Sequence, residues 1–233
     1  MVNRLEVIPI EGIGEIKPGD DLAVLIAEAI AASGETLGDG DVLVITHKVV
    51  SKAEGRIADA PDDASYRQLV EKEAAAILRR RGDLVITRTP HGFICANAGV
   101  DRSNADAGTA VLLPVDPDRS AHRLRTRIEQ ATGASIGVVV TDTFGRAWRQ
   151  GLVDVAIGVS GLPATVDLRG TVDGSGRLLE VTEIAIVDEI AAAADLVKGK
   201  ANHVPAVIVR GLDLSGDGRA LDLVRPAEGD LFR

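Results

Sequence analysis

The chain has 233 residues, of which 45% are hydrophobic and 26% charged, a composition typical of a folded protein with a sizeable core. Only 2% of the residues are aromatic, so that core must be built from Val, Ile, Leu and Ala. The formal net charge of −9 disfavours nucleic acid and anionic membranes as partners, because both require basic surfaces. Cys95 is the one cysteine, which excludes an intrachain disulfide and a cysteine-rich zinc site.

The N-terminal residues lack the apolar segment of a signal peptide, and no apolar run approaches the roughly 18–20 residues of a membrane span. We therefore expect a cytoplasmic protein with no membrane partner. Hydrophobic periodicity and turn residues then predict the elements of the first half of the chain. These are strands at residues 4–10, 42–46, 84–89 and 92–97, helices at 22–32, 66–81 and 122–132, and a loop at 114–120.

An apolar run that starts at Ile136 predicts a buried strand, which ends in the polar residues Thr141, Asp142 and Thr143. Further strands are expected at residues 153–158, 164–168 and 206–210, a Gly-rich turn at 170–176 and a helix at 182–198. Strands and helices alternate without the strict order of a doubly wound sheet, so the predicted fold class is α+β. We find no internal repeat and no low-complexity linker, and treat residues 1–233 as one functional domain.

Two acidic segments are the main site candidates. Asp142 follows the run at 136–140, and Asp101 lies in the segment AGVDRSN after another apolar stretch. Carboxylates, with a hydroxyl such as that of Thr143, are ligands for Mg²⁺ or Mn²⁺, completed by water and substrate phosphate. Either aspartate alone is more simply read as a turn or capping residue. The pair, with cations nearby, favours a metal site.

Cations near these segments are candidates for neutralising phosphate charge. Lys52 and Arg146 lie among small residues and are the better candidates, whereas Lys48 is expected to be an ordinary surface lysine. The turn Gly12-Ile13-Gly14 could contact a phosphate through its backbone N–H groups. The chain has no Walker-type P-loop and no well-placed GxGxxG, so a nucleotide site here must be of an unusual kind.

We interpret the histidines, Cys95 and Trp148 as structural residues. The histidines are too scattered for a zinc site, and no GxSxG elbow occurs. Cys95 lies in an apolar segment and is interpreted as a small buried hydrophobe. Trp148 is either a core residue or a stacking surface for a ring ligand, and the core interpretation is preferred.

Five segments together resemble a known family. GDVLVITHKVVSKAEGR, CANAGVDRSN, VVVTDTFGRAWRQG, VTEIAIVDEIAAAADLVKGK and PAVIVRG are similar to the coenzyme F420:L-glutamate ligase family over nearly the whole chain. The resemblance implies an amide-forming ligase that uses GTP and Mg²⁺ or Mn²⁺, with K⁺ as a further candidate cation. Its substrates would be L-glutamate and the phospholactyl 5-deazaflavin precursor of coenzyme F420, with further glutamates added through γ-linkages. It also implies two interleaved α/β subdomains in an intertwined homodimer.

The resemblance also assigns roles to residues of this chain. It implies Asp101, Asp142 and Thr143 as metal ligands and Lys52 and Arg146 as catalytic cations. Nucleotide contacts would come from Ile13, Gly14, Glu15, Ile16, His47, Lys52 and Asn104. Some relatives carry a C-terminal flavin-dependent reductase domain, so the chain is expected to be a stand-alone ligase or the ligase part of such a fusion.

This chain departs from the family pattern in two places. His47 stands where the family often has serine, and Lys200 falls where some archaeal relatives have an acidic residue. The departures leave two alternatives open: a ligase of the same fold with another acceptor, and a non-catalytic GTP-binding module. The sequence marks no general base.

Overall fold

A mixed five-stranded sheet forms the centre of the computed structural model, which describes residues 4–103, 105–199, 202–214 and 216–230. The strand order is β1-β12-β2-β8-β9. β2 and β8 are parallel, and the other neighbours are antiparallel. The strands are β1 (Glu6–Ile10), β2 (Val42–Thr46), β8 (Gly137–Arg146), β9 (Arg149–Ser160) and β12 (Ala206–Arg210).

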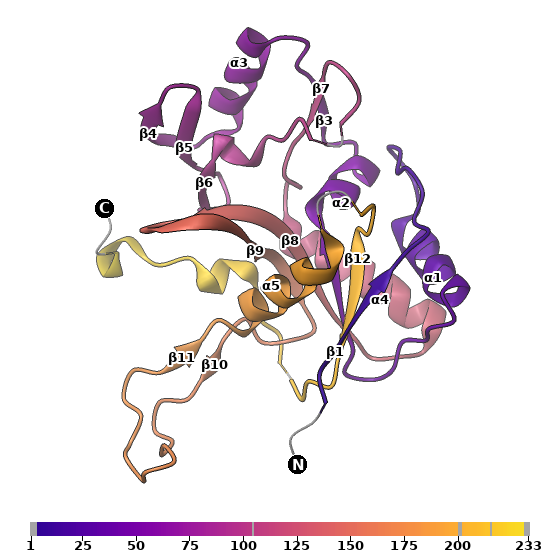
Figure 1. Ribbon diagram of the computed structural model, residues 1–233, viewed down its shortest axis with the longest axis vertical. Coiled ribbons are helices and arrows are strands. Elements are labelled where there is room, and N and C mark those ends of the chain that lie inside the picture. Colours follow the sequence, from indigo (N-terminus) through magenta and orange to yellow (C-terminus); the bar gives the residue numbers. More distant parts are fainter. Residues whose placement is uncertain (1–3, 104, 200–201, 215, 231–233) are drawn as a thin grey trace.

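Helices cover both faces of this sheet. Figure 1 shows α5 (Ile186–Lys198) in front of the sheet, and α4 (Pro117–Thr132) with α1 (Leu22–Ala32) behind it. The inner residues of β2 are buried throughout, as expected for a short apolar run covered on both sides. The core between these layers is almost wholly aliphatic, as the low aromatic content predicts.

A smaller unit lies above the sheet in Figure 1 and has its own hydrophobic core, which includes Leu69, Val70 and Val100. The helix α2 (His47–Ala53) leads into it from β2. Its elements are β3 (Ile57–Asp59), α3 (Asp63–Glu73), β4 (Ala76–Arg81), β5 (Leu84–Arg88), β6 (Ile94–Ala96), the 3₁₀ turn η1 (Asn97–Gly99) and β7 (Thr109–Val111). The fold is therefore mixed α and β, consistent with the predicted α+β class.

An arm projects from the sheet at the lower left of Figure 1. It is built on β10 (Val166–Asp167) and β11 (Glu183–Ile184), and it contains the predicted Gly-rich turn. Two 3₁₀ turns follow β12, η2 (Ala220–Leu223) and η3 (Ala227–Gly229). Each helix within the described ranges is too short or too polar to span a lipid bilayer.

The predicted helix at residues 66–81 is wrong in its second half. The helix α3 begins after Asp62, whose carboxylate accepts a hydrogen bond from Ser65 N, and ends at Glu73. Residues 76–81 instead form β4, paired antiparallel with β5. The sequence AILRRR has good helix propensity, but pairing with a neighbouring strand outweighs that local preference.

Three other boundaries also differ from the prediction. The segment predicted as a loop at 114–120 contains the first turn of α4, because Asp116 caps the helix and Pro117 starts it. The predicted helix at 182–198 begins only at Ile186, since Glu183 and Ile184 pair with β10. The predicted strand at 164–168 is reduced to Val166–Asp167.

The largest difference concerns the stretch after Val140. It is not a loop: β8 continues through Asp142 to Arg146 and turns back into β9 as a long hairpin. Trp148 lies in the hairpin turn with φ of 61° and is 84% exposed, so the core interpretation of this residue is wrong. The strands at 42–46 and 206–210, the helix at 22–32 and the end of α4 at Gly133 are confirmed.

Candidate active site

The pairing of β2 with β8 brings the first polar residues together. The two strands run parallel, and Thr46 is the register partner of Thr141. The next residue of each chain segment is therefore His47, at the start of α2, and Asp142, in β8. In parallel strands the polar residues that follow two apolar runs meet at one end of the sheet.

His47 and Asp142 form the first contact of the site. The His47 side chain is fully buried, and its Nε2 atom lies 3.3 Å from Asp142 Oδ1. Among the described residues, Nε2 makes no well-aligned hydrogen bond, whereas Nδ1 lies 3.4 Å from the Ser51 hydroxyl. Asp142 Oδ1 also accepts a hydrogen bond of 2.7 Å from Thr143 N.

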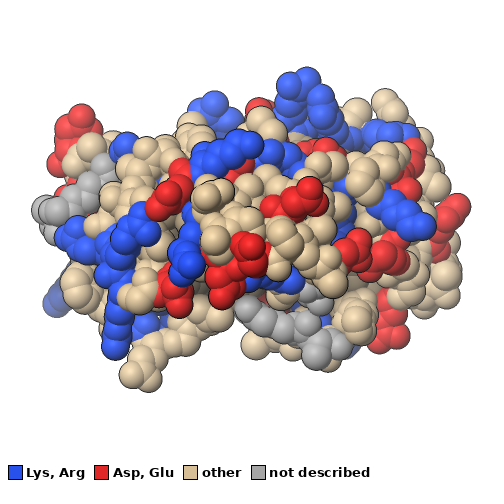
Figure 2. All heavy atoms as spheres, turned by 90° about the horizontal axis from the view of Figure 1, so that it is seen from above, with Lys and Arg blue, Asp and Glu red and all other residues tan. Residues whose placement is uncertain are grey.

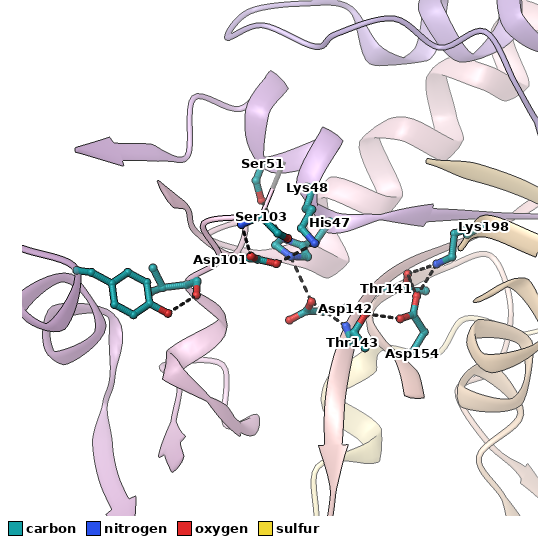
Figure 3. Close-up of polar contacts among 12 residues, drawn as sticks. His47, Lys48, Ser51, Asp101, Ser103, Thr141, Asp142, Thr143, Asp154 and Lys198 are labelled. Atoms are coloured by element: carbon teal, nitrogen blue, oxygen red, sulfur yellow. Dashed lines mark hydrogen bonds and ion pairs between the residues drawn. The ribbon is translucent and has the colours of Figure 1, made fainter. Parts of the chain in front are cut away.

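Asp101 reaches the same region from the smaller unit. Its Oδ2 atom lies 2.8 Å from Lys48 Nζ, and its Oδ1 atom accepts a hydrogen bond of 2.6 Å from Ser103 N. Burial opposes ionisation of Asp101, but the hydrogen bond and charge of Lys48 outweigh it and hold the pKa below the ordinary value. Consecutive residues of α2 thus contact the two predicted metal ligands, His47 at Asp142 and Lys48 at Asp101 (Figure 3).

The approach to Asp101 is fixed by three successive residues with left-handed backbone, Asn97, Ala98 and Gly99, with φ of 51°, 54° and 70°. Such a run is rare outside glycine and needs specific support. Asn97 Oδ1 accepts from Val85 N at 3.0 Å, and Ala98 N donates to Thr87 Oγ1 at 2.9 Å. These contacts turn the chain from β6 back towards α2.

A cavity of about 560 Å³ lies beside these residues. Basic and hydroxyl side chains line it together with the loop after β1 and the residues after α5. Its lining includes Ile13, Gly14, Glu15, Thr46, Lys48, Lys52, Ser103, Thr143, Asp154, Lys198, His203 and Val204. A cavity of this size with a few convergent polar groups is typical of a small-ligand site.

The predicted nucleotide contacts divide into two groups. Ile13, Gly14 and Glu15 line the cavity, and Lys52 donates a hydrogen bond to Glu15 across it. Ile16, in contrast, is only 4% exposed and belongs to the hydrophobic core. Lys52 is largely buried in the last turn of α2, and its aliphatic part is held there while its ammonium group reaches the cavity.

Thr143 faces a different set of partners from Asp142, because successive side chains of a strand point to opposite faces. Its hydroxyl donates to Asp154 Oδ1 at 2.6 Å, and the Thr141 hydroxyl donates to Asp154 Oδ2 at 3.0 Å. Lys198 Nζ donates to both Asp154 Oδ2, at 2.5 Å, and Thr141 Oγ1, at 2.7 Å. Burial opposes ionisation of Asp154, yet the charge of Lys198 and these hydrogen bonds lower its pKa.

Arg146 is not brought to the cavity within one chain. It lies four residues beyond Asp142 along β8, a distance of about 13 Å at the usual rise of a strand, and its guanidinium donates to Gln150 O. Asn104 and Lys200, which the family resemblance singled out, lie outside the described residues.

The oxygen donors at this site suit a hard divalent cation. Among the described residues, no group of three or more His, Cys, Asp and Glu side chains is arranged to hold a metal. Mg²⁺ is commonly held by one or two carboxylates, with water and substrate phosphates completing the shell, which is what Asp101 and Asp142 beside a cavity could supply. The buried, poorly bonded Nε2 atom of His47 marks the same spot as polar and incompletely satisfied.

Several site residues escaped the sequence analysis. Lys48 was expected to be a surface lysine, but its side chain is only 18% exposed and pairs with Asp101. Asp154 gave no motif, and Lys198 was noted only within a segment similar to the family, although an aspartate within an apolar strand and a lysine at the end of an apolar helix face are signals of a buried pair. Cys95 is buried as predicted, and burial raises the pKa of its thiol to about 12.

The surface around this region mixes both signs of charge. Figure 2 shows basic and acidic side chains interspersed over the upper face of the molecule. The cavity wall is mixed as well: it carries Lys48, Lys52 and Lys198 together with Glu15, Asp154 and Asp195.

Comparison with known proteins identifies the family. The profile of the family described as "F420-0:Gamma-glutamyl ligase" matches residues 12–211. The protein named "Coenzyme F420:L-glutamate ligase" from Methanothermobacter thermautotrophicus is 43% identical over 249 residues, covering 98% of this chain and 99% of that protein. Proteins with the same name from Methanopyrus kandleri and Archaeoglobus fulgidus are each 42% identical and cover 99% of this chain and 97% of their own length.

Carboxylates, ammonium groups and hydroxyls converging on one cavity define an enzyme site, and the named relatives place the chain in the ligase class. The chain belongs to the F420-0:gamma-glutamyl ligase family. The family resemblance inferred from the sequence motifs is thereby confirmed.

Proposed function

We propose that this chain is a GTP- and divalent-metal-dependent ligase that adds L-glutamate to the phospholactyl 5-deazaflavin precursor of coenzyme F420, and then adds further γ-linked glutamates. The family membership supports the reaction class, since the named relatives are coenzyme F420:L-glutamate ligases. The observation that carries the proposal is the meeting of Asp101 and Asp142 at α2, beside a cavity lined by Lys48 and Lys52.

The chemistry requires activation of a carboxylate, because its oxide leaving group is too basic to be displaced by an amine. A carboxylate oxygen of the precursor attacks the γ-phosphorus of GTP, the bond to the β–γ bridging oxygen breaks, and GDP leaves. The glutamate nitrogen then attacks the acyl carbon. The carbon–oxygen bond to phosphate breaks, releasing inorganic phosphate and the amine proton. Three anionic partners must be held close together in this sequence.

The residues of the chain divide this task. Asp101 and Asp142 would hold Mg²⁺ or Mn²⁺, with Thr143 offering a hydroxyl oxygen from the cavity side of β8. When bound, such a cation neutralises phosphate charge and orients the phosphates. K⁺ is a further candidate cation. Lys52, now paired with Glu15, would bind phosphate oxygens. Ile13, Gly14 and Glu15 with Asn104 would contact the nucleotide, whereas the buried Ile16 and His47 would not.

Ligation is tested by incubating the protein with GTP, Mn²⁺, L-glutamate and the deazaflavin precursor and measuring product masses. We expect glutamyl adducts with wild type. Asp142→Asn is expected to abolish them while leaving the melting temperature within a few degrees of wild type. Phosphate release with a different amine or acid, without a glutamyl adduct, would show a ligase with another acceptor. GTP binding without turnover on any acceptor would show a binding module.

We further propose that the functional form is an intertwined homodimer. Apolar side chains are exposed on the two projecting parts of the chain, Trp148 and Leu152 on the β8–β9 hairpin and Val172, Leu178 and Val181 on the arm. Leu196 on α5 and Val115 are exposed as well, but several exposed apolar side chains on one projection favour a protein partner. A second copy would cover them and would bring Arg146, on the hairpin, towards another surface.

The dimer is tested by light scattering after size exclusion and by acrylamide quenching of Trp148, the sole tryptophan. We expect a mass of twice 24.3 kDa and protection of the indole from the quencher. Trp148→Glu should shift the mass towards the monomer. A monomeric wild type with a fully quenchable tryptophan would contradict the proposal.

A further inference from the structure

A buried polar cluster lies behind Thr143, on the face of β8 opposite Asp142. It consists of Thr141 and Thr143 from β8, Asp154 from β9 and Lys198 from the end of α5 (Figure 3). Asp154 and Lys198 are each 4% exposed, and Thr141 is fully buried. Thr143, Asp154 and Lys198 nevertheless line the cavity, so the cluster forms part of its wall.

A buried ion pair is a poor stabilising device, because desolvation of the two charges offsets most of their attraction. Replacing a buried ion pair by hydrophobic residues of similar size is often neutral for stability or stabilising. Among the described residues, the other charged groups that line the cavity are Lys48, Lys52, Glu15 and Asp195, and His203 lines it as well. A buried ion pair with four directed hydrogen bonds at the cavity wall is therefore better explained by its effect on the groups that face the cavity.

Hydrogen-bond directions define that role. Lys198 can only donate, and it donates to Asp154 Oδ2 and Thr141 Oγ1. An ionised Asp154 can only accept, so the Thr143 hydroxyl must donate its single proton to Asp154 Oδ1. The proton of Thr143 is thereby committed to the interior. Its oxygen offers only lone pairs to the cavity and can contact a cation but cannot donate to a phosphate oxygen.

We infer that Asp154 and Lys198 are positioning residues that fix the Thr143 hydroxyl as an acceptor towards a divalent cation in the cavity. This inference rests on the proposed function, in which Thr143 contributes to the metal site. Groups that orient a metal ligand are typically worth about 10–100-fold in metal affinity. The pair acts through Thr143 and does not itself touch the cation.

The test is a titration of Mn²⁺ into the full chain with GDP present, following free Mn²⁺ by electron paramagnetic resonance. Because Lys198→Met alone would leave Asp154 buried and unpaired, the informative variant is the double change Asp154→Leu with Lys198→Met, which buries no charge. A leucine at position 154 accepts no hydrogen bond, which frees the Thr143 hydroxyl proton to point into the cavity. We expect Mn²⁺ affinity to fall about 10-fold or more.

A thermodynamic cycle separates positioning from a merely structural role. Thr143→Val alone should weaken Mn²⁺ binding to a similar extent, and adding it to the double variant should cause no further loss, since both changes remove the same interaction. Thr143→Ser should retain wild-type affinity. The matched control is Arg67→Met with Asp83→Asn, which removes an exposed ion pair of 3.2 Å in the smaller unit and should leave Mn²⁺ binding unchanged.

The outcomes distinguish this inference from the proposed function. If wild type does not bind Mn²⁺, or if Asp142→Asn binds it as wild type does, the metal assignment of the proposed function fails. If wild type binds and Asp142→Asn does not, but the double variant at Asp154 and Lys198 retains wild-type affinity, the positioning role is refuted. Losses that add fully in the combination with Thr143→Val would also refute it, because the pair would then not act through Thr143.

Discussion

Gly99 lies two residues before Asp101, and replacing it with alanine should perturb both stability and the site. The residue has φ of 70°, a conformation that costs a non-glycine residue free energy. A Cβ atom added there would lie 2.6–2.8 Å from Cγ, Cδ1 and Cδ2 of Leu113. Leu113 is only 3% exposed and packs in the main core, so it has little room to move away.

The two costs can be estimated separately. A left-handed conformation of a residue with Cβ costs about 1–2 kcal/mol. Overpacking a core by one methyl group costs about 1–3 kcal/mol. Together they predict a loss of roughly 2–5 kcal/mol of unfolding free energy. For a protein of this size each kcal/mol lowers the melting temperature by about 2–4 °C, so the expected fall is roughly 4–20 °C.

The measurement is thermal unfolding by circular dichroism, combined with the ligation assay at a temperature where the variant is folded. Gly174→Ala is the matched control, because Gly174 has no left-handed backbone and a Cβ there would meet nothing within 4 Å. We expect the melting temperature of the control to lie within about 2 °C of wild type. We expect Gly99→Ala also to lose ligation activity, because Asp101 would be displaced. A Gly99→Ala variant with wild-type stability would refute the reasoning from the Leu113 contact.

Further predictions concern Asp188, Cys95 and Lys52. Burial raises the pKa of Asp188, so its ionised form costs folding free energy at neutral pH, and this cost disappears as the pH falls through the raised pKa. Urea unfolding should therefore show wild type gaining stability relative to Asp188→Asn between about pH 7 and pH 4.5. The variant Asp213→Asn, at an exposed position, is the control. Because the Cys95 pKa is raised to about 12, the thiol should resist Ellman's reagent in the native state at about pH 8 and react once per chain in urea; rapid native labelling would contradict this. Lys52→Met should raise the KM for GTP about 10-fold or more, because the variant loses a hydrogen bond between a charged donor and a phosphate. Lys72→Met, on the exposed side of α3, should leave the KM unchanged.

The elements that the sequence predicted well are those whose apolar pattern and neighbours agree. The run VLVIT is too short and too apolar for anything but a buried strand, and the helix at 22–32 shows a clear apolar face and an Asp21 cap. The segment AILRRR was assigned wrongly because its strand partner, β5, could not be known from local propensity. The hairpin after Val140 was missed for a similar reason: polar residues in a strand resemble a loop until their cross-strand partners are seen.

The residues of the candidate site also differ in how well the sequence predicts them. Asp101 and Asp142 could be named because acidic residues after apolar runs are a local signal, and their approach to α2 follows from strand register. The contacts of Lys48, Asp154 and Lys198 could not be predicted, because each joins elements that are distant in the chain. Lys198 and Asp154 are 44 residues apart, and only the packing of α5 on β9 brings them together.

Asp101 belongs to the smaller unit, whereas Asp142 belongs to the central sheet, and each unit has its own hydrophobic core. A cation bound by both carboxylates would add a direct link between the two units. Limited proteolysis and amide exchange in residues 57–111 should therefore slow when the cation is bound, so that loading of the site also restrains the smaller unit.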